Sequence, residues 1–280
     1  MKRTQKRFSN LNAMKQTEQS SLYSDLDKMS TMDLLKGINS EDTKVPQVVA
    51  GCIPQIAKLV DGIVERMQRG GRVFYIGAGT SGRIGITDAS EIFPTYGLDG
   101  AFIGIIAGGD GAIRRAVEGA EDNSRKGWAD LLAYSPTQED TIVGITASGG
   151  APYVLGALKH ARRFGMLTSC VCCNEASPAA KEADVPIIAV VGPEFVTGST
   201  RMKAGTATKL ILNMISTSVM IRLGHVKGNR MVDMQLSNKK LVDRGTRMIM
   251  AETGIRDYEA AKALLLEHGS VRAAIDSITE

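Results

Sequence analysis

The sequence predicts an α/β fold, namely a doubly wound, parallel five-stranded sheet with a small helical unit at the C-terminus. Between residues 72 and 191, five short apolar runs alternate with stretches of helical pattern. Each run is continuously apolar, which suits parallel strands that are buried on both faces. Strands that alternate with helices build βαβ units with right-handed crossovers, so the runs are expected to form one sheet.

The segment before the sheet is predicted to be helical from about residue 30 to Gly70. Residues 1–29 read as a flexible or loosely docked lead, because the basic start "MKRTQKRFSN" is followed by no apolar segment of a signal peptide. Pro54 is expected to kink or divide the helical stretch, and the pair Gly70-Gly71 is expected to end it.

The predicted sheet domain spans residues 30–235. Its strands are expected at residues 72–77, 101–107, 141–147, 167–173 and 185–191. A long helix from Met202 to Leu223 is apolar on most faces, which predicts burial in the core or in a subunit interface. Residues 236–280 are expected to form the small helical unit, with two short helices that are split at Gly269.

The composition excludes several classes of protein. The chain has 280 residues, 43% hydrophobic and 23% charged, with a formal charge of +4. Its basic residues are not concentrated, and six Phe, six Tyr and one Trp offer few stacking groups, so we expect no nucleic-acid partner. No apolar stretch approaches the ~20 residues of a membrane helix. These features predict a cytoplasmic protein without a membrane partner.

The four cysteines predict neither a metal site nor a disulfide. Cys52 stands alone, whereas Cys170, Cys172 and Cys173 lie within one predicted strand, where adjacent side chains point to opposite faces. Buried, reduced thiols are therefore expected.

The first strand is followed by "GAGTSGR", which has the G-x-G-x-x-G spacing of dinucleotide-binding turns. A nicotinamide site also needs an acidic residue about 20 positions further on, at the end of the second strand. That strand ends in "IIAGGD" instead, so we expect no nucleotide cofactor.

Three turns at the carboxyl edge of the predicted sheet favour a single phosphate group. Ligands of such sheets bind outside the carboxyl ends of the strands, where hydroxyls and free N–H groups at helix starts can hold a phosphate. Taken alone, each Ser or Thr could be only a helix cap. The candidate phosphate-binding residues are Thr80, Ser81, Gly82, Ser148, Gly149, Ser199, Thr200, Arg201 and Lys203.

These turns resemble the SIS (sugar isomerase) fold of phosphosugar proteins. More narrowly, "GAGTSGRIGITDASE", "AVEGAEDN", "VVGPEFVTGSTRMKAGTATKLILNMIST" and "GNRMVD" resemble the N-acetylmuramic acid 6-phosphate etherase family, over most of the chain from about Met29. The resemblance implies cleavage of a lactyl ether by β-elimination and hydration, without metal or other cofactor. It also implies a homodimer, in which active sites are completed across subunits.

Two glutamates are the candidate catalytic residues. On sequence grounds alone, Glu91 in "DASE" and Glu121 in "EGAEDN" are ordinary surface carboxylates. The resemblance implies that Glu91 is the proton donor and Glu121 the second acid–base residue, and we expect Glu121 to be the base. Glu118 is then a positioning or structural residue.

Two other functions stay open at this stage. One is a hexosamine-phosphate isomerase, which shares the phosphate turns and a carboxylate base. The other is a non-catalytic sugar-phosphate sensor like the glucokinase regulatory proteins. The chain also departs from the etherase pattern in one turn, because "ASGGAPY" replaces the A-S-G-R-T-P-Y that the family often has. Gly150 and Ala151 therefore cannot supply the contacts of an Arg and a Thr side chain.

Overall fold

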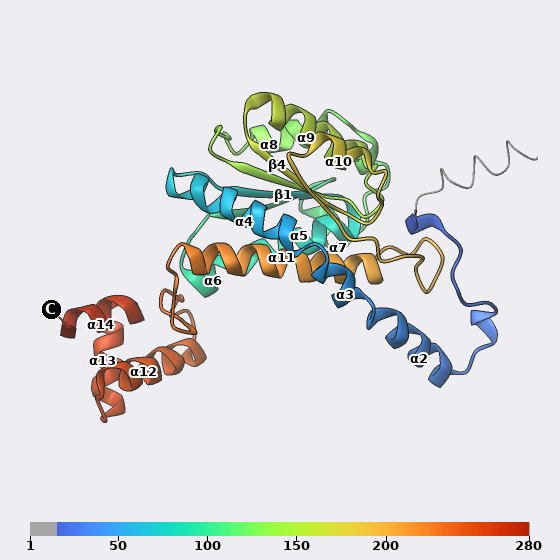
Figure 1. Cartoon of the computed structure of the whole chain (residues 1–280). Helices are drawn as coiled ribbons and strands as arrows, with labels where there is room; N and C mark the ends of the chain where they lie inside the picture. The colour runs from blue at the N-terminus through green and yellow to red at the C-terminus, as the bar shows by residue number, and fades with distance from the viewer. Residues whose placement is uncertain (1–15, 280) are drawn as a thin grey trace, which may run out of the picture.

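The computed structural model describes residues 16–279, and its centre is a parallel sheet with helices on both faces (Figure 1). The strands lie in the order β2-β1-β3-β4-β5, and each neighbouring pair is parallel. The predicted doubly wound, five-stranded sheet is thus confirmed. The strands are β1 (Val73–Gly77), β2 (Phe102–Ile106), β3 (Thr141–Ile145), β4 (Leu167–Cys172) and β5 (Val185–Ile188).

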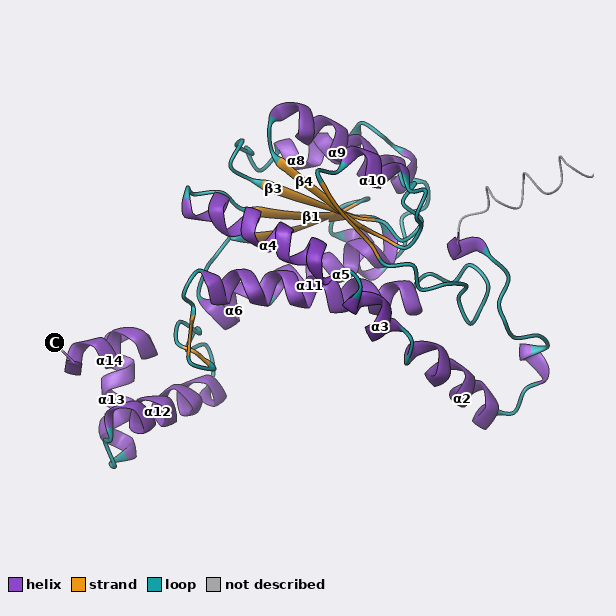
Figure 2. Ribbon diagram, viewed as in Figure 1, coloured by secondary structure: helices purple, strands orange, loops and turns teal. Residues whose placement is uncertain are grey.

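Alternate residues of the strands serve two hydrophobic cores. Val73 and Tyr75 of β1 face a core shared with α3 (Val45–Ala50), α4 (Ile53–Gln68) and α11 (Lys203–Arg222). Phe74 and Ile76 face the opposite core. The second core is covered by α8 (Lys126–Leu132), α9 (Pro152–Phe164) and α10 (Pro178–Glu182), which form the upper layer in Figure 2.

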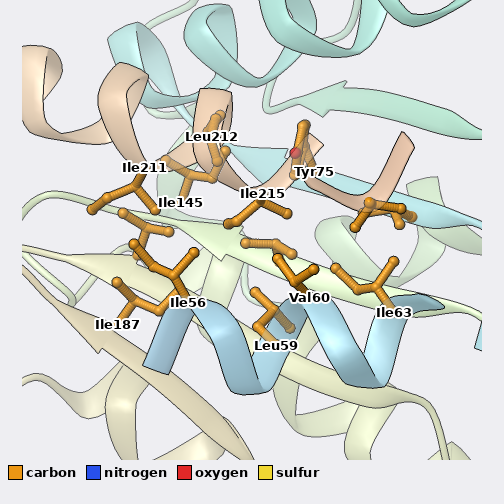
Figure 3. Packing of buried hydrophobic residues seen from close by; sticks show 14 of the residues in the cluster. Ile56, Leu59, Val60, Ile63, Tyr75, Ile145, Ile187, Ile211, Leu212 and Ile215 are labelled. Carbon is orange, nitrogen blue, oxygen red and sulfur yellow. The ribbon is translucent and has the colours of Figure 1, made fainter. Parts of the chain in front are cut away.

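The long helix α11 belongs to the first core. Figure 3 shows Ile211 and Ile215 of α11 close to Ile56 and Val60 of α4. Ile211 and Ile215 are fully buried. The prediction that this apolar helix is buried is confirmed.

The helical stretch before the sheet is divided at the predicted place. Helix α2 (Thr31–Asp42) and α3 are followed by α4, and Pro54 stands in the first turn of α4. Pro54 lacks the N–H that a continuous helix would need there, so a new helix starts. The axis bends by 57° between Thr31–Ala50 and Ile53–Gln68. Among the described residues no single helix meets the length and apolarity of a membrane span, although this bent pair does by length and composition.

Part of the predicted lead is docked on the sheet domain. The short helices η1 (Gln16–Glu18) and η2 (Leu26–Lys28) lie in it, and residues 1–15 are outside the described part of the chain. The Tyr23 ring packs on Phe195 with ring centroids 4.7 Å apart. Of the two predicted alternatives, docking describes residues 17–23, because Thr17, Ser21 and Tyr23 contact residues far along the sequence.

The C-terminal unit has a hydrophobic core of its own. It comprises α12 (Lys239–Thr253), α13 (Tyr258–His268) and α14 (Val271–Thr279), and it follows a hairpin of β6 (Val226–Lys227) and β7 (Arg230–Met231). The predicted split at Gly269 is confirmed, whereas α12 and the hairpin were not predicted. Arg272 of α14 donates hydrogen bonds to Asp233 and to the carbonyl of Gly224, which tie the unit to the end of α11.

The four cysteines are free and buried, as expected. Across residues 16–279, no group of three or more His, Cys, Asp or Glu side chains could hold a metal ion.

Candidate active site

A cavity of about 280 Å³ opens at the carboxyl ends of the strands. It lies where the strand order reverses between β1 and β3, which is the position at which doubly wound sheets bind ligands. The turns after β1, β3 and β5 all contribute to it, as expected from the sequence. The lining residues are Glu18, Ala78, Gly79, Thr80, Ser81, Glu121, Ile145, Thr146, Ala147, Ser148, Ala151, Thr200, Ala204, Gly205 and Thr208.

The turn after β1 leads directly into α5 (Gly79–Ser90), whose first residues line the cavity. The N-cap residue of α5 is Ala78, so within the described chain no side chain caps this helix start. Its first N–H groups are therefore available to a ligand. Gly82 is not in the lining but allows the close approach of α5 to the sheet, because a Cβ there would lie 2.6 Å from Ile106.

The turn after β3 places a second helix start at the cavity. Ser148 lines the cavity, and its hydroxyl accepts a hydrogen bond from the N–H of Gly150 at 3.3 Å. Helix α9 follows from Ala151, again with no side-chain cap among the described residues. Gly149 has a φ of +70°, and a Cβ there would overlap Ser177, so this glycine shapes the turn.

The turn before α11 contributes less than the sequence suggested. Thr200 lines the cavity, but Ser199, Arg201 and Lys203 are outside the lining that the structure describes. The Lys203 side chain is 2% exposed, and its Nζ lies 2.6 Å from Oε2 of Glu41, which is 3% exposed. The prediction of Lys203 as a phosphate ligand does not fit this geometry, because its ammonium group is already bound in a buried ion pair.

A buried carboxylate also occupies the start of α11. Glu194 accepts hydrogen bonds from the N–H groups of Lys203 and Ala204, at 2.9 and 3.0 Å. Burial raises the pKa of Glu194, although these backbone hydrogen bonds oppose the rise. The first N–H groups of α11 are thus used inside the protein.

The electrostatics of the cavity depend on backbone groups. No Lys or Arg is among its lining residues in the described chain. The open starts of α5 and α9, with 12 and 13 residues, supply partial positive charge and N–H donors. The hydroxyls of Thr80, Ser81 and Ser148 add further hydrogen-bond donors to the same lining.

The two predicted catalytic glutamates are not brought together in one chain. Glu121, in η3 (Ala120–Asp122), lines the cavity and also a neighbouring one of about 170 Å³ that Glu118 and Arg83 share. Glu91 lies at the C-terminal end of α5, whereas the cavity lies at the N-terminal end of the same helix. At 1.5 Å per residue, the 12-residue helix separates Glu91 from the cavity by about 18 Å.

Three polar residues of the cavity lining were not predicted from the sequence, namely Glu18, Thr146 and Thr208. Glu18 comes from the docked lead, and Thr208 lies on α11 one turn beyond Ala204. The helical period would have placed Thr208 beside Ala204. No local pattern indicates Glu18, because its position depends on contacts with residues more than 150 positions away.

Curated relatives resemble the chain over almost its whole length. N-acetylmuramic acid 6-phosphate etherases from Porphyromonas gingivalis and Bacteroides fragilis are each 60% identical to it over 265 residues. Each alignment covers 94% of this chain. It covers 96% of the Porphyromonas gingivalis protein and 94% of the Bacteroides fragilis protein. The chain belongs to the N-acetylmuramic acid 6-phosphate etherase family. It is an enzyme family of the lyase type, and the more distant etherase of Caldanaerobacter subterraneus still shares 53% identity over 90% of the chain.

Domain models and solved structures agree with the fold of this etherase family. The model of the SIS domain matches residues 131–218, and the model of the glucokinase regulatory protein N-terminal SIS domain matches residues 55–162. A phosphoheptose isomerase from Francisella tularensis superposes with a TM-score of 0.53 at 19% identity, over 69% of this chain and 100% of that one. A phosphoheptose isomerase from Neisseria gonorrhoeae gives a TM-score of 0.51 at 14% identity, over 68% of this chain and 98% of that one. These likenesses show the SIS fold.

Proposed function

We propose that this etherase cleaves the D-lactyl ether of N-acetylmuramic acid 6-phosphate. The products are D-lactate and N-acetylglucosamine 6-phosphate, which fits the recycling of cell-wall amino sugars in the cytoplasm. One observation carries the proposal: the open starts of α5 and α9 and the Glu121 carboxylate line the same cavity. A phosphate held at the helix starts fixes one end of a sugar, and Glu121 then faces its carbon chain.

The reaction divides into elimination and hydration. The sugar opens to its aldehyde, which makes the C2 proton acidic, and Glu121 removes that proton as the general base. The C3–O bond breaks, the lactyl oxygen takes a proton from a second acid, and a C2–C3 double bond forms. Water then adds back, with its hydroxyl at C3 and a proton at C2. The net change consumes one water, and the proton transfers need only carboxyl groups, so we propose no cofactor.

Glu91 can be the second acid only if another subunit supplies it. Its distance from the cavity within one chain therefore favours a homodimer in which each Glu91 reaches the site of the partner. Exposed apolar side chains near it support such an interface, since Phe93 is 45% exposed. Met32 and Leu35 on the projecting helix α2 are each 59% exposed (Figure 1).

The test is the substitution Glu121→Gln, which keeps the shape of the side chain but removes the base. We expect it to abolish release of D-lactate from N-acetylmuramic acid 6-phosphate and exchange of the C2 proton with deuterated water. Binding of N-acetylglucosamine 6-phosphate should persist. The matched control is Asp122→Asn, which removes a neighbouring carboxylate outside the cavity lining and should leave both rates unchanged.

The same assays separate the two alternatives. An isomerase would exchange the C2 proton and interconvert aldose and ketose phosphates without releasing an acid. A sensor would bind the sugar phosphate but produce no D-lactate. Retained proton exchange in Glu121→Gln would assign the base to another residue.

A further inference from the structure

Glu18 is a second carboxylate in the cavity, and the mechanism above does not use it. It belongs to η1 in the docked lead, and its side chain is solvent-exposed at the cavity. Its carboxylate forms no hydrogen bond or ion pair with any other residue that the structure describes. It is therefore available to a bound ligand.

The neighbouring residue fixes the position of Glu18. Thr17 is 1% exposed, and its N–H donates to Oδ1 of Asn174 at 3.1 Å, while Nδ2 of Asn174 donates to Oγ1 of Thr17 at 3.1 Å. The same Nδ2 also donates to the carbonyl of Ala147, which lines the cavity. On the other side of Glu18, three residues after it, the N–H of Ser21 donates a hydrogen bond to Oγ1 of Thr197. Glu18 is thus held between two anchors on the loops after β4 and β5.

Glu18 and Glu121 face the cavity from opposite ends of the strand order. Glu121 follows β2, whereas the anchors of Glu18 follow β4 and β5. The turns of β1 and β3, which carry the open helix starts, lie between them. At about 4.8 Å per strand, β2 and β4 are roughly 14 Å apart. Glu18 is closest to the β5 side, because a Cβ on Gly198 would lie 3.4 Å from its Oε2.

The charge of Glu18 works against a bare phosphate but suits a hydroxylated chain. Like charges in one cavity repel each other, so an unpaired carboxylate in the lining weakens the binding of every phosphate, and only a ligand that also donates hydrogen bonds to this carboxylate offsets the repulsion. An ionised carboxylate is also a strong acceptor for hydroxyl donors. In an open-chain hexosamine 6-phosphate, the C4 and C5 hydroxyls lie between the phosphate and the reacting C2–C3 bond. These are the donors that a carboxylate beside the phosphate site can reach.

We propose that Glu18 is a specificity-determining residue, which accepts hydrogen bonds from the C4 and C5 hydroxyls of the sugar and excludes free phosphate. The proposal rests on the proposed function for the identity of the sugar. It gives the docked lead a direct role in substrate binding, since the Thr17–Asn174 contact holds the segment from which this carboxylate extends.

The substitution Glu18→Gln separates the two effects, and its ligands are N-acetylglucosamine 6-phosphate and inorganic phosphate. Calorimetry and phosphorus NMR titration of the full chain would measure both affinities. We expect the sugar phosphate to bind about tenfold more weakly, because a hydrogen bond to a charged acceptor is lost. We expect inorganic phosphate to bind about two- to fivefold more tightly, because the repulsion is removed.

Two further variants test the interpretation. Glu18→Asp keeps the charge but shortens the side chain, so it should lose sugar affinity while still excluding phosphate. Glu267→Gln removes an exposed carboxylate of α13 and controls for net charge, so it should change neither affinity.

The outcomes are distinguishable from those of the proposed function. If Glu18→Gln changes the affinity for both ligands equally, or changes neither, the proposed role of Glu18 is wrong. Release of D-lactate by the parent protein would still support the proposed function in that case. Failure of the parent protein to bind N-acetylglucosamine 6-phosphate would overturn both.

Discussion

Helices α5 and α9 differ from α11 in whether a side chain of the protein accepts hydrogen bonds from the N–H groups of their first turns. All three helices begin at the same edge of the sheet. The starts of α5 and α9 have no side-chain cap within residues 16–279, and they border the cavity. The start of α11 receives the Glu194 carboxylate from inside the protein, and Lys203 in its first turn is paired with Glu41. A carboxylate already occupies the anion position of α11, so only the other two starts are free for a substrate phosphate.

This difference shows that turns of similar composition serve two purposes. The run "TGSTRMK" has as many hydroxyl and cationic residues as a phosphate site would need. Lys203 of this run instead anchors α11 to α2, because its partner Glu41 belongs to α2. The run therefore holds the cavity wall in place, while Thr200 alone of its hydroxyl residues is in the described lining.

The largest expected effect comes from breaking the buried pair with Lys203→Met. Removing one partner of a buried ion pair leaves an uncompensated charge and costs about 3–5 kcal/mol. We expect about 3 kcal/mol here, because Lys44 still donates to Glu41 at 2.6 Å. Denaturant unfolding would measure the loss, and the affinity of the folded fraction for N-acetylglucosamine 6-phosphate should stay unchanged.

The double variant Lys203→Met with Glu41→Gln is the control for that prediction. It removes the charge that the single variant leaves buried, so it should be more stable than the single variant. A large loss of phosphate affinity with little change in stability would instead make Lys203 a ligand and remove the contrast between the helix starts.

The next effect is on binding, and Ser148→Ala is its test. The Ser148 hydroxyl lies beside the open start of α9, so its loss should weaken N-acetylglucosamine 6-phosphate about tenfold and N-acetylglucosamine much less. The free energy of unfolding should change by no more than about 1 kcal/mol, the contribution of the one turn hydrogen bond that is lost. Ser199→Ala, in the turn before α11, is the matched control, and its affinities should equal those of the parent protein. Equal weakening of both sugars by Ser148→Ala would reduce Ser148 to a turn residue.

The sequence predicts the sheet and much of the cavity for physical reasons. Each of the five strands is a short, mostly apolar run, and parallel strands bring the turns that follow them to one edge. Thr80, Ser81, Ser148 and Thr200 were all predicted from those turns, and all line the cavity.

The rest depends on contacts that no local pattern encodes. Lys203 is paired with a residue 162 positions away. Glu18 is positioned by the Thr17–Asn174 contact, which joins residues 157 positions apart. The separation of Glu91 from the cavity is different, because it follows from the 12-residue length of α5, a local feature from which the sequence analysis drew no distance.

The smallest expected effect is on the pH dependence of stability, and it distinguishes Glu41 from Glu194 at the start of α11. Burial alone would raise the pKa of Glu41, but hydrogen bonds from Lys203 and Lys44 outweigh it, and the pKa is lowered from 4.5. Glu41 therefore stabilises the fold above pH 4.5, and this contribution is lost as the pH falls toward its folded pKa. The raised pKa of Glu194 has the opposite effect on stability, because the free energy of unfolding declines as the pH rises from 4.5 through its folded pKa.

Unfolding free energies measured across this pH range test the difference. Below pH 4.5, the loss of stability with falling pH should be shallower in Glu41→Gln. In Glu194→Gln the decline above pH 4.5 should be absent. Identical profiles for the two variants would mean that pairing with Lys203 does not distinguish Glu41 from Glu194, whose carboxylate accepts only backbone N–H groups in the described chain.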